Sequence, residues 1–110
     1  MSDANIDLAT TALLLCDLQN DFLHPKGAYG RAGQTSEAVA AVPARVAPLA
    51  RAMRAAGCPV IATLFTMVPG RSGAPIIASH LKQLRPFLGR GDFQPGAWGH
   101  DIVDELKPID

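Results

Sequence analysis

The most restrictive feature of the sequence is a short apolar run without alternation, TALLLC at residues 11–16. A strand with one solvated face alternates apolar and polar residues, whereas a strand covered on both faces does not. A second run of this kind, PVIATLFTM at residues 59–67, is bounded by Gly57 and by Pro69-Gly70. Two such runs predict an α/β protein with a parallel sheet.

Between the two runs, the apolar residues change to spacings of three and four, the pattern of an amphipathic helix. They are Val39, Val42, Val46, Leu49, Met53 and Ala56. Because proline is favoured only in the first turn of a helix, Pro43 and Pro48 predict a continuous helix over 43–56 with a weaker turn before it. Ser36 or Thr35 is expected to cap this region and Gly57 to end it. Strand, helix and strand in this order form a βαβ unit.

The rest of the chain carries weaker signals. Closely spaced glycines and Pro25 predict an extended loop from the first strand to about Thr35. A helical turn is expected near residues 81–84 and a short helix over 100–108, halted by a proline. A two-stranded sheet is marginal by itself in water. We therefore expect residues 1–110 to form the N-terminal part of a single, larger, doubly wound domain.

Composition and charge limit the possible partners. The chain has 110 residues, ten basic and ten acidic, and 48% of them are hydrophobic. This neutral balance gives no electrostatic reason to expect nucleic acid or an anionic membrane as a partner. The N-terminus is polar and acidic, unlike a signal peptide, and no apolar run approaches the roughly 18 residues that span a bilayer. A cytoplasmic protein is the expectation.

The two cysteines, Cys16 and Cys58, do not suggest a disulfide. One ends the first predicted strand and the other begins the second, so parallel pairing would separate them by roughly 15–20 Å. A disulfide needs Cα atoms within about 7 Å of each other. Both cysteines are expected to be reduced and buried.

Asp17 is the main candidate for chemistry because it ends the most apolar run of the chain. In open α/β sheets, ligands bind outside the carboxyl ends of the strands. The alternative is that Asp17 only caps a helix or forms a turn. Asp21 is better placed to brace the loop, and Gln19 and Asn20 to bond loop backbone groups. Phe22 is a candidate for either the pocket wall or the core.

Three chemistries could use an aspartate at this position. Phosphate binding is disfavoured because a carboxylate repels phosphate and the loop lacks G-x-G-x-x-G. An aspartyl phosphoryl-transfer site of the pattern D-x-D-x-T would need a second acid where Gln19 stands. The third chemistry is general-base catalysis, in which Asp17 accepts a proton from a nucleophile on another loop.

Three segments in this order resemble the isochorismatase-like cysteine hydrolases: ALLLCDLQNDF, ARAMRAAGCPVIAT and GAWGHDIVDELKP. This family includes ureidoacrylate, biuret and N-carbamoylsarcosine amidohydrolases, nicotinamidases and isochorismatase. The resemblance covers nearly the whole chain. It implies a three-layer doubly wound fold around a six-stranded parallel sheet, of which this chain would hold only the first βαβ half. It also implies a homo-oligomer.

The resemblance implies a catalytic trio of Asp, Lys and Cys. Asp17 matches the first acid of the family element D-x-Q-x-D-F, and it would take the proton of a thiol that attacks an amide or ureido carbonyl. The family Lys and Cys lie beyond the segment that this chain matches. None of the residues Lys26, Lys82, Lys107, Cys16 and Cys58 stands at their positions.

The residues at the end of the second predicted strand, and those just after it, give information on substrate binding and on metal binding. Phe65 and Thr66, at its carboxyl end, are expected to line the substrate pocket with Phe22. Nicotinamidases carry a D-x-H metal motif after this strand, whereas the sequence here reads LFTMVPGRSG. The resemblance therefore implies a hydrolase without a metal or cofactor, acting on a small amide or ureido compound. The alternatives are an isochorismatase-type vinyl ether hydrolase and a non-catalytic binding or assembly module of the same fold.

Overall fold

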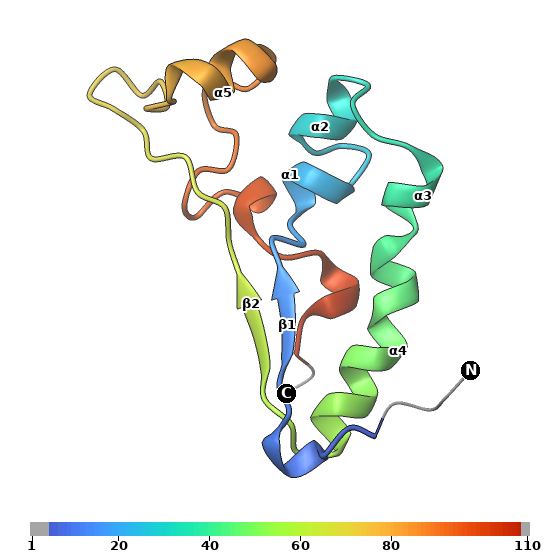
Figure 1. Ribbon diagram of the computed structural model, residues 1–110. Helices are drawn as coiled ribbons and strands as arrows, with labels where there is room; N and C mark the ends of the chain where they lie inside the picture. Colours follow the sequence, from blue (N-terminus) through green and yellow to red (C-terminus); the bar gives the residue numbers. More distant parts are fainter. Residues whose placement is uncertain (1–4, 109–110) are drawn as a thin grey trace.

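Two parallel strands form the centre of the structure, a computed structural model that describes residues 5–108 (Figure 1). Strand β1 (Leu13–Cys16) pairs with β2 (Val60–Thr63), so that Leu13 lies opposite Val60 and Cys16 opposite Thr63. The predicted parallel pair is confirmed. The second strand is shorter than the predicted 59–67, because beyond Thr63 the chain bonds to the side chain of Gln19 instead of to a strand.

The helices are mostly short. The α-helices are α1 (Asn20–Leu23), α2 (Ala28–Arg31), α3 (Glu37–Ala40), α4 (Val42–Ala55) and α5 (Ser79–Leu84), and the 3₁₀ helices are η1 (Leu8–Thr10), η2 (Trp98–His100) and η3 (Asp104–Leu106). Two predictions were wrong: the stretch to Thr35 is not an extended loop, since it contains α1 and α2, and 100–108 is not one helix. Ile102 interrupts the latter by forming a bridge with Gln19. No helix between residues 5 and 108 combines the length and apolar character needed to cross a membrane.

Helix α4 follows its predicted bounds closely. Pro43 lies in its first turn, and Pro48 is tolerated in the interior with its ring exposed to solvent. Gly57 ends the helix with φ 79°, a left-handed conformation that glycine adopts without strain. Ser36 caps the preceding turn, α3, by accepting a hydrogen bond from the backbone N–H of Val39 at 3.3 Å.

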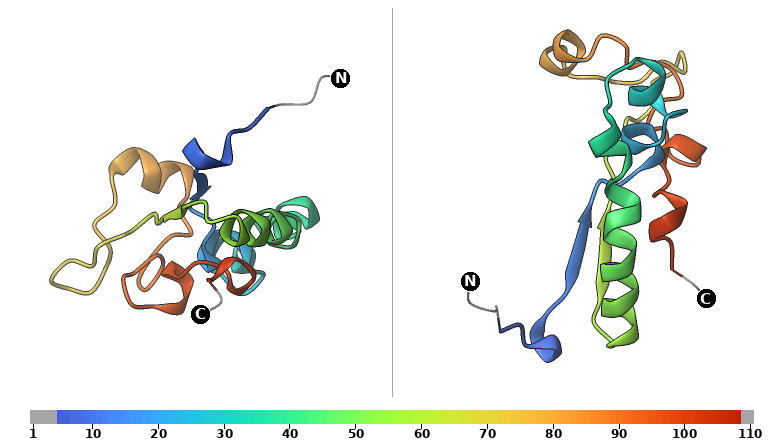
Figure 2. Two further views of the ribbon diagram at one scale, coloured as in Figure 1. Left: turned by 90° about the horizontal axis from the view of Figure 1, so that it is seen from below. Right: turned by 90° about the vertical axis from the view of Figure 1, so that its right-hand side faces the viewer.

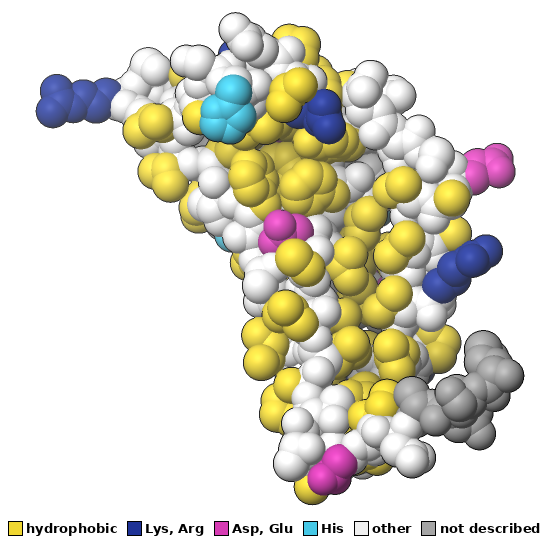
Figure 3. Space-filling model, in the orientation of Figure 1, with side chains coloured by type: hydrophobic (Ala, Val, Ile, Leu, Met, Phe, Trp, Pro, Cys, Tyr) yellow, Lys and Arg dark blue, Asp and Glu magenta, His cyan; other side chains and the backbone are white. Residues whose placement is uncertain are grey.

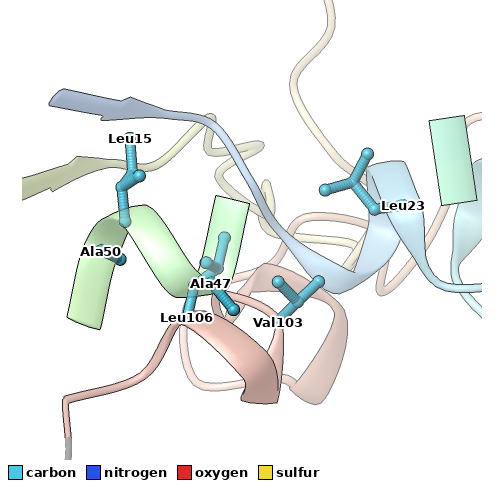
Figure 4. Packing of buried hydrophobic residues seen from close by; sticks show 6 residues of the cluster. All are labelled: Leu15, Leu23, Ala47, Ala50, Val103 and Leu106. Atoms are coloured by element: carbon cyan, nitrogen blue, oxygen red, sulfur yellow. The ribbon is translucent and has the colours of Figure 1, made fainter. Parts of the chain in front are cut away.

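The main core lies between β1, α4 and the segment from η2 to η3 (Figure 4). Two small residues of α4, Ala47 and Ala50, allow the helix to approach Leu15 closely, and Leu106 closes the far side. Arg54 ties the layers together by donating a hydrogen bond to the backbone oxygen of Leu106 at 2.9 Å. Both views in Figure 2 show α4 and the C-terminal segment on the same side of the sheet.

The opposite face of the sheet is uncovered in the described chain. Leu14 and Ile61 lie side by side on this face, and their exposed fractions are 59% and 52%. Cys16 points to the same face and is exposed, so the expectation that both cysteines are buried was wrong for Cys16 and right for Cys58. Both are free thiols. The chain therefore contains the βαβ part of a doubly wound fold, with helices on one face.

The packing of the core predicts that Leu106 and Leu49 contribute very differently to the free energy of unfolding. We expect Leu106→Ala to lower the free energy of unfolding by about 2–5 kcal/mol, because it leaves a cavity behind α4. Leu49→Ala is the matched control, since Leu49 lies on α4 with half of its surface exposed, and it should change stability by less than about 1 kcal/mol. Urea denaturation measures both values. Equal effects would contradict this description of the core.

Candidate functional site

Asp17 lies at the carboxyl end of β1 and has an unusual backbone. Its φ is 58°, in the left-handed region that few residues other than glycine adopt, although aspartate is among the more tolerant. The Asp17 N–H donates to the backbone oxygen of Thr63 at 3.2 Å, so β1 remains paired up to this point. The chain leaves the extended conformation at Asp17 and enters α1, which lies beyond the carboxyl end of β1 (Figure 1).

The carboxylate of Asp17 is held by the neighbouring strand. The hydroxyl of Thr63 donates to Oδ1 of Asp17 at 2.7 Å, and the same hydroxyl oxygen accepts the Asp17 N–H at 3.1 Å. The Asp17 side chain is half-buried and lines a hollow of about 400 Å³. It is therefore neither sealed in the protein nor bonded only within its own turn. Thr63 was missed in the sequence, although its place opposite Cys16 in the register could have identified it.

The hollow beside Asp17 is mostly apolar. It is lined by Cys16, Asp17, Phe22, Leu23, Tyr29, Gln34 and Val39. In Figure 3, hydrophobic side chains gather above the end of the sheet and along the flank of α4. In a regular strand the side chains of Cys16 and Asp17 would point to opposite faces, but both line this hollow. The left-handed φ of Asp17 breaks the pleat and explains the difference.

The predicted pocket residues are only partly brought together. Phe22 lines the hollow, and its ring packs against those of Phe65 and Phe93 at centroid distances of 5.8 and 4.5 Å. Phe65 belongs to this aromatic cluster and is partly buried, but it does not line the hollow. Thr66 lies apart, with its hydroxyl 2.8 Å from Nε2 of His100. The assignment of Phe65 and Thr66 to substrate binding stays a prediction.

Gln19 and Asn20 bond loop backbone groups, as predicted. The Gln19 side chain is completely buried, accepts the N–H of Phe65 at 2.7 Å and donates to the oxygens of Phe65 and His100 at 2.9 and 2.7 Å. The Asn20 side chain donates to the oxygen of Trp98 at 2.9 Å. These bonds join the end of β1 to the chain after β2 and to η2.

Asp21 braces the loop, also as predicted. The residue is 3% exposed, and its carboxylate accepts the N–H groups of Ala28 at 2.9 Å and Phe93 at 2.8 Å. Gly99 packs directly against this carboxylate, where a Cβ atom would collide with it. Both oxygens of Asp21 thus have backbone partners. Asp21 also borders a small hollow of about 190 Å³ lined mainly by charged and polar groups, whereas Asp17 borders the apolar hollow at the end of β1.

A second hollow, of about 380 Å³, lies between α4 and η3 and is lined by charged residues. They are Arg51, Arg54, Asp104, Glu105 and Lys107. Lys107 donates to Asp101 and Asp104 at 2.9 and 3.2 Å, and its hydrogen bond lowers the pKa of the Asp101 carboxyl below the usual value. None of the predicted site residues lies here. Among residues 5–108, no three His, Cys, Asp or Glu side chains form a group that could hold a metal ion.

The fold and the site define an α/β protein in which the first parallel strand ends in a carboxylate beside an apolar hollow. The family model of the isochorismatase domain matches residues 11–110, and the chain therefore belongs to the isochorismatase family. It is similar to the ureidoacrylate amidohydrolase RutB of Methylobacterium radiotolerans, with 34% identity over 112 residues. This match covers 94% of the chain and 43% of the relative, so the chain spans less than half of the relative's length. The resemblance and the fold class predicted from the sequence are confirmed.

The structural role of Asp21 can be tested with a substitution of equal size. Asp21→Asn would replace one acceptor oxygen by an NH₂ group that faces a backbone N–H. We expect it to lower the free energy of unfolding by about 2–3 kcal/mol. The control, Asp104→Asn, changes a carboxylate whose side chain is 81% exposed and should have an effect within about 0.5 kcal/mol. Thermal and urea unfolding measure both, and an unaffected Asp21→Asn variant would refute the bracing role.

Proposed function

We propose that the protein carrying this sequence is a cysteine hydrolase that cleaves a C–N bond of a small amide or ureido compound. Residues 1–110 would form the N-terminal part of its single domain. Membership of the isochorismatase family and similarity to a ureidoacrylate amidohydrolase support this proposal. The observation that carries it is the position of Asp17, at the carboxyl end of β1 and on the wall of the hollow.

Asp17 would act as the general base. Its Oδ1 already accepts the hydroxyl of Thr63, which leaves Oδ2 available for a second donor. A thiol that approached through the hollow would give its proton to this oxygen, and the resulting thiolate would attack the substrate carbonyl carbon. As the tetrahedral intermediate collapses and the C–N bond breaks, the nitrogen would take the proton from Asp17 and leave as ammonia or an amine, and a thioester would form. Water would then hydrolyse the thioester to the acid.

The nucleophile would come from a segment outside these residues. Cys58 is buried and its thiol bonds to the backbone oxygen of Leu8 at 3.4 Å, at the end of the sheet away from Asp17. Cys16 lines the hollow but is part of β1 itself. Within residues 5–108, β1 pairs with β2 on one edge only, so an added strand or loop could bring a thiol and a lysine to Asp17 from the other edge. A non-catalytic module of the same fold would lack these two groups.

The role of Asp17 predicts a selective loss of turnover. In the natural protein, Asp17→Asn should lower kcat by roughly 100- to 10,000-fold, the range that a positioned general base contributes. Circular dichroism and the melting temperature should remain near those of the wild type. The assay should include ureidoacrylate, a simple primary amide and isochorismate, so that vinyl ether cleavage is detected separately.

Two results of this assay would contradict the proposal. Wild-type turnover in Asp17→Asn would remove Asp17 from the mechanism. Loss of activity in the control variant Cys16→Ser, with the fold retained, would mean that the nucleophile belongs to this chain and lies on β1.

Thr63 should position Asp17 without touching the substrate. We expect Thr63→Val to lower kcat about tenfold with little change in KM, because it removes one hydrogen bond to the carboxylate and keeps the shape of the side chain. Thr63→Ser keeps the hydroxyl and should recover most of the rate. Steady-state kinetics distinguish the two variants. If Ser and Val were equally impaired, the hydroxyl would have no such role.

A further inference from the structure

Tyr29 is a polar residue of the hollow that the proposed reaction does not use. It belongs to α2, which lies beyond the carboxyl end of β1 (Figure 1), and it lines the same hollow as Asp17. Three aromatic rings pack against its ring: Phe22 and Phe87 at centroid distances of 5.0 Å, and Phe93 at 6.2 Å. Because these contacts fix the ring, they also fix the position of the hydroxyl group.

The Tyr29 hydroxyl is hydrogen-bonded to an arginine. Nε of Arg85, the residue that follows α5, donates to the Tyr29 oxygen at 3.3 Å, and the guanidinium carbon lies 5.9 Å from the centre of the Tyr29 ring. The backbone of Arg85 is bonded on both sides. Its N–H donates to the oxygen of Leu81 at 2.8 Å, and its oxygen accepts the N–H of Leu88 at 3.1 Å. The pair is therefore built into the fold.

Arg85 carries a charge that no acidic residue between 5 and 108 neutralises. The ion pairs of this part of the chain involve Arg31 and Lys107, and Arg85 takes part in none of them. Nη1 of Arg85 donates to the backbone oxygen of Leu84 at 3.0 Å, and Nη2 has no hydrogen-bond partner among the described residues. A half-buried guanidinium without a counter-ion favours an anion beside it.

The hydrogen bond from Arg85 also determines what the Tyr29 hydroxyl can bind. The oxygen of this hydroxyl accepts from Arg85, and its hydrogen has no acceptor among residues 5–108. A charged donor polarises the hydroxyl and makes its O–H a stronger donor. Of the basic residues in the described chain, Arg85 is the one whose side chain bonds to a residue lining the hollow. The two residues thus combine an O–H donor with a positive charge.

We propose that Tyr29 and Arg85 recognise a carboxylate of the substrate, which narrows the substrate class to amides and ureido compounds that are also acids. The inference rests on the proposed function, in which Asp17 marks the place of the reacting carbonyl. The Tyr29 hydroxyl donates to a carboxylate oxygen, and the charge of Arg85 stabilises the anion from behind this hydroxyl. Asp17 repels a carboxylate beside it, so the acid group of the substrate binds away from Asp17.

The first test compares ureido acids with ureas in which a methyl group replaces the carboxylate. Ureidoacetate is paired with ethylurea, and 3-ureidopropionate with propylurea. In the natural protein, Tyr29→Phe removes only the hydroxyl. It should lower kcat/KM for the preferred acid by roughly 10- to 100-fold, the range for a hydrogen bond to a charged group, mainly through KM. The alkyl ureas have no acceptor at this end, and their kcat/KM should change by less than about threefold.

The second test removes the charge. Arg85→Met should lower kcat/KM for the acids by about tenfold or more, and Arg85→Lys should recover part of this loss because it keeps the charge. Arg51→Met is the matched control, since it removes an equal charge from α4, beside the other hollow, and should leave both classes of compound unaffected. Circular dichroism checks that each variant folds. Equal losses with acids and alkyl ureas would give the pair a purely structural role and would overturn the proposal.

Binding without turnover separates this inference from the proposed function. Calorimetry on the Asp17→Asn variant should show tighter binding of the acids than of the alkyl ureas, and adding Tyr29→Phe should remove this difference. If the wild type bound the acids selectively but hydrolysed none of the compounds, the proposed function would fail and the recognition of a carboxylate would stand. Turnover with no preference for the acids would overturn this inference alone. Absence of selective binding, or selectivity unchanged by Tyr29→Phe, would overturn it whether or not hydrolysis occurs.

Discussion

The buried side chain of Gln19 is the constraint on which the arrangement of the site depends. Its amide oxygen and nitrogen pair with both backbone groups of Phe65, much as a neighbouring strand would, and the nitrogen also bonds to His100. A buried amide without partners would cost several kcal/mol, so the three segments must meet at this point. For Gln19 to reach this position, the chain must leave the extended conformation after β1. The left-handed conformation of Asp17 makes that turn.

The elements with a strong period could be predicted from the sequence. β1, β2 and α4 follow from two unalternated apolar runs and one stripe of spacing three and four, with Gly57 as a physical stop. The helical turns of α1 and α2 could not be predicted this way. Each is a single turn, too short for a period to appear, and both depend on hydrogen bonds outside the turn, such as those that the N–H groups of Ala28 and Phe93 donate to Asp21.

The candidate site was predictable to a similar extent. The place of Asp17 follows from the rule that ligands bind at the carboxyl ends of parallel strands. Its partner Thr63 depends on the register of two strands, and register is set by tertiary packing as well as by local sequence. The fact that Cys16 and Asp17 line the same hollow depends on a single dihedral angle, φ of Asp17. Alternation assumes an unbroken pleat, and the positive φ at the strand end removes that assumption.

Asp17 and Asp21 are four residues apart, but their carboxylates differ in how completely they are hydrogen-bonded. Asp21 has a backbone N–H on each oxygen and is almost completely buried, so its charge is committed to the fold. Asp17 has one hydroxyl donor on one oxygen and an apolar hollow beside it. Such a position is unfavourable for a carboxylate that serves only stability, since a shorter polar residue could form the same turn. The left-handed backbone at Asp17 adds to this cost, and strain of this kind is concentrated at functional sites. The incomplete bonding of Asp17 is thus a feature that stability alone does not explain, and the proposed role of Asp17 as a general base rests on it.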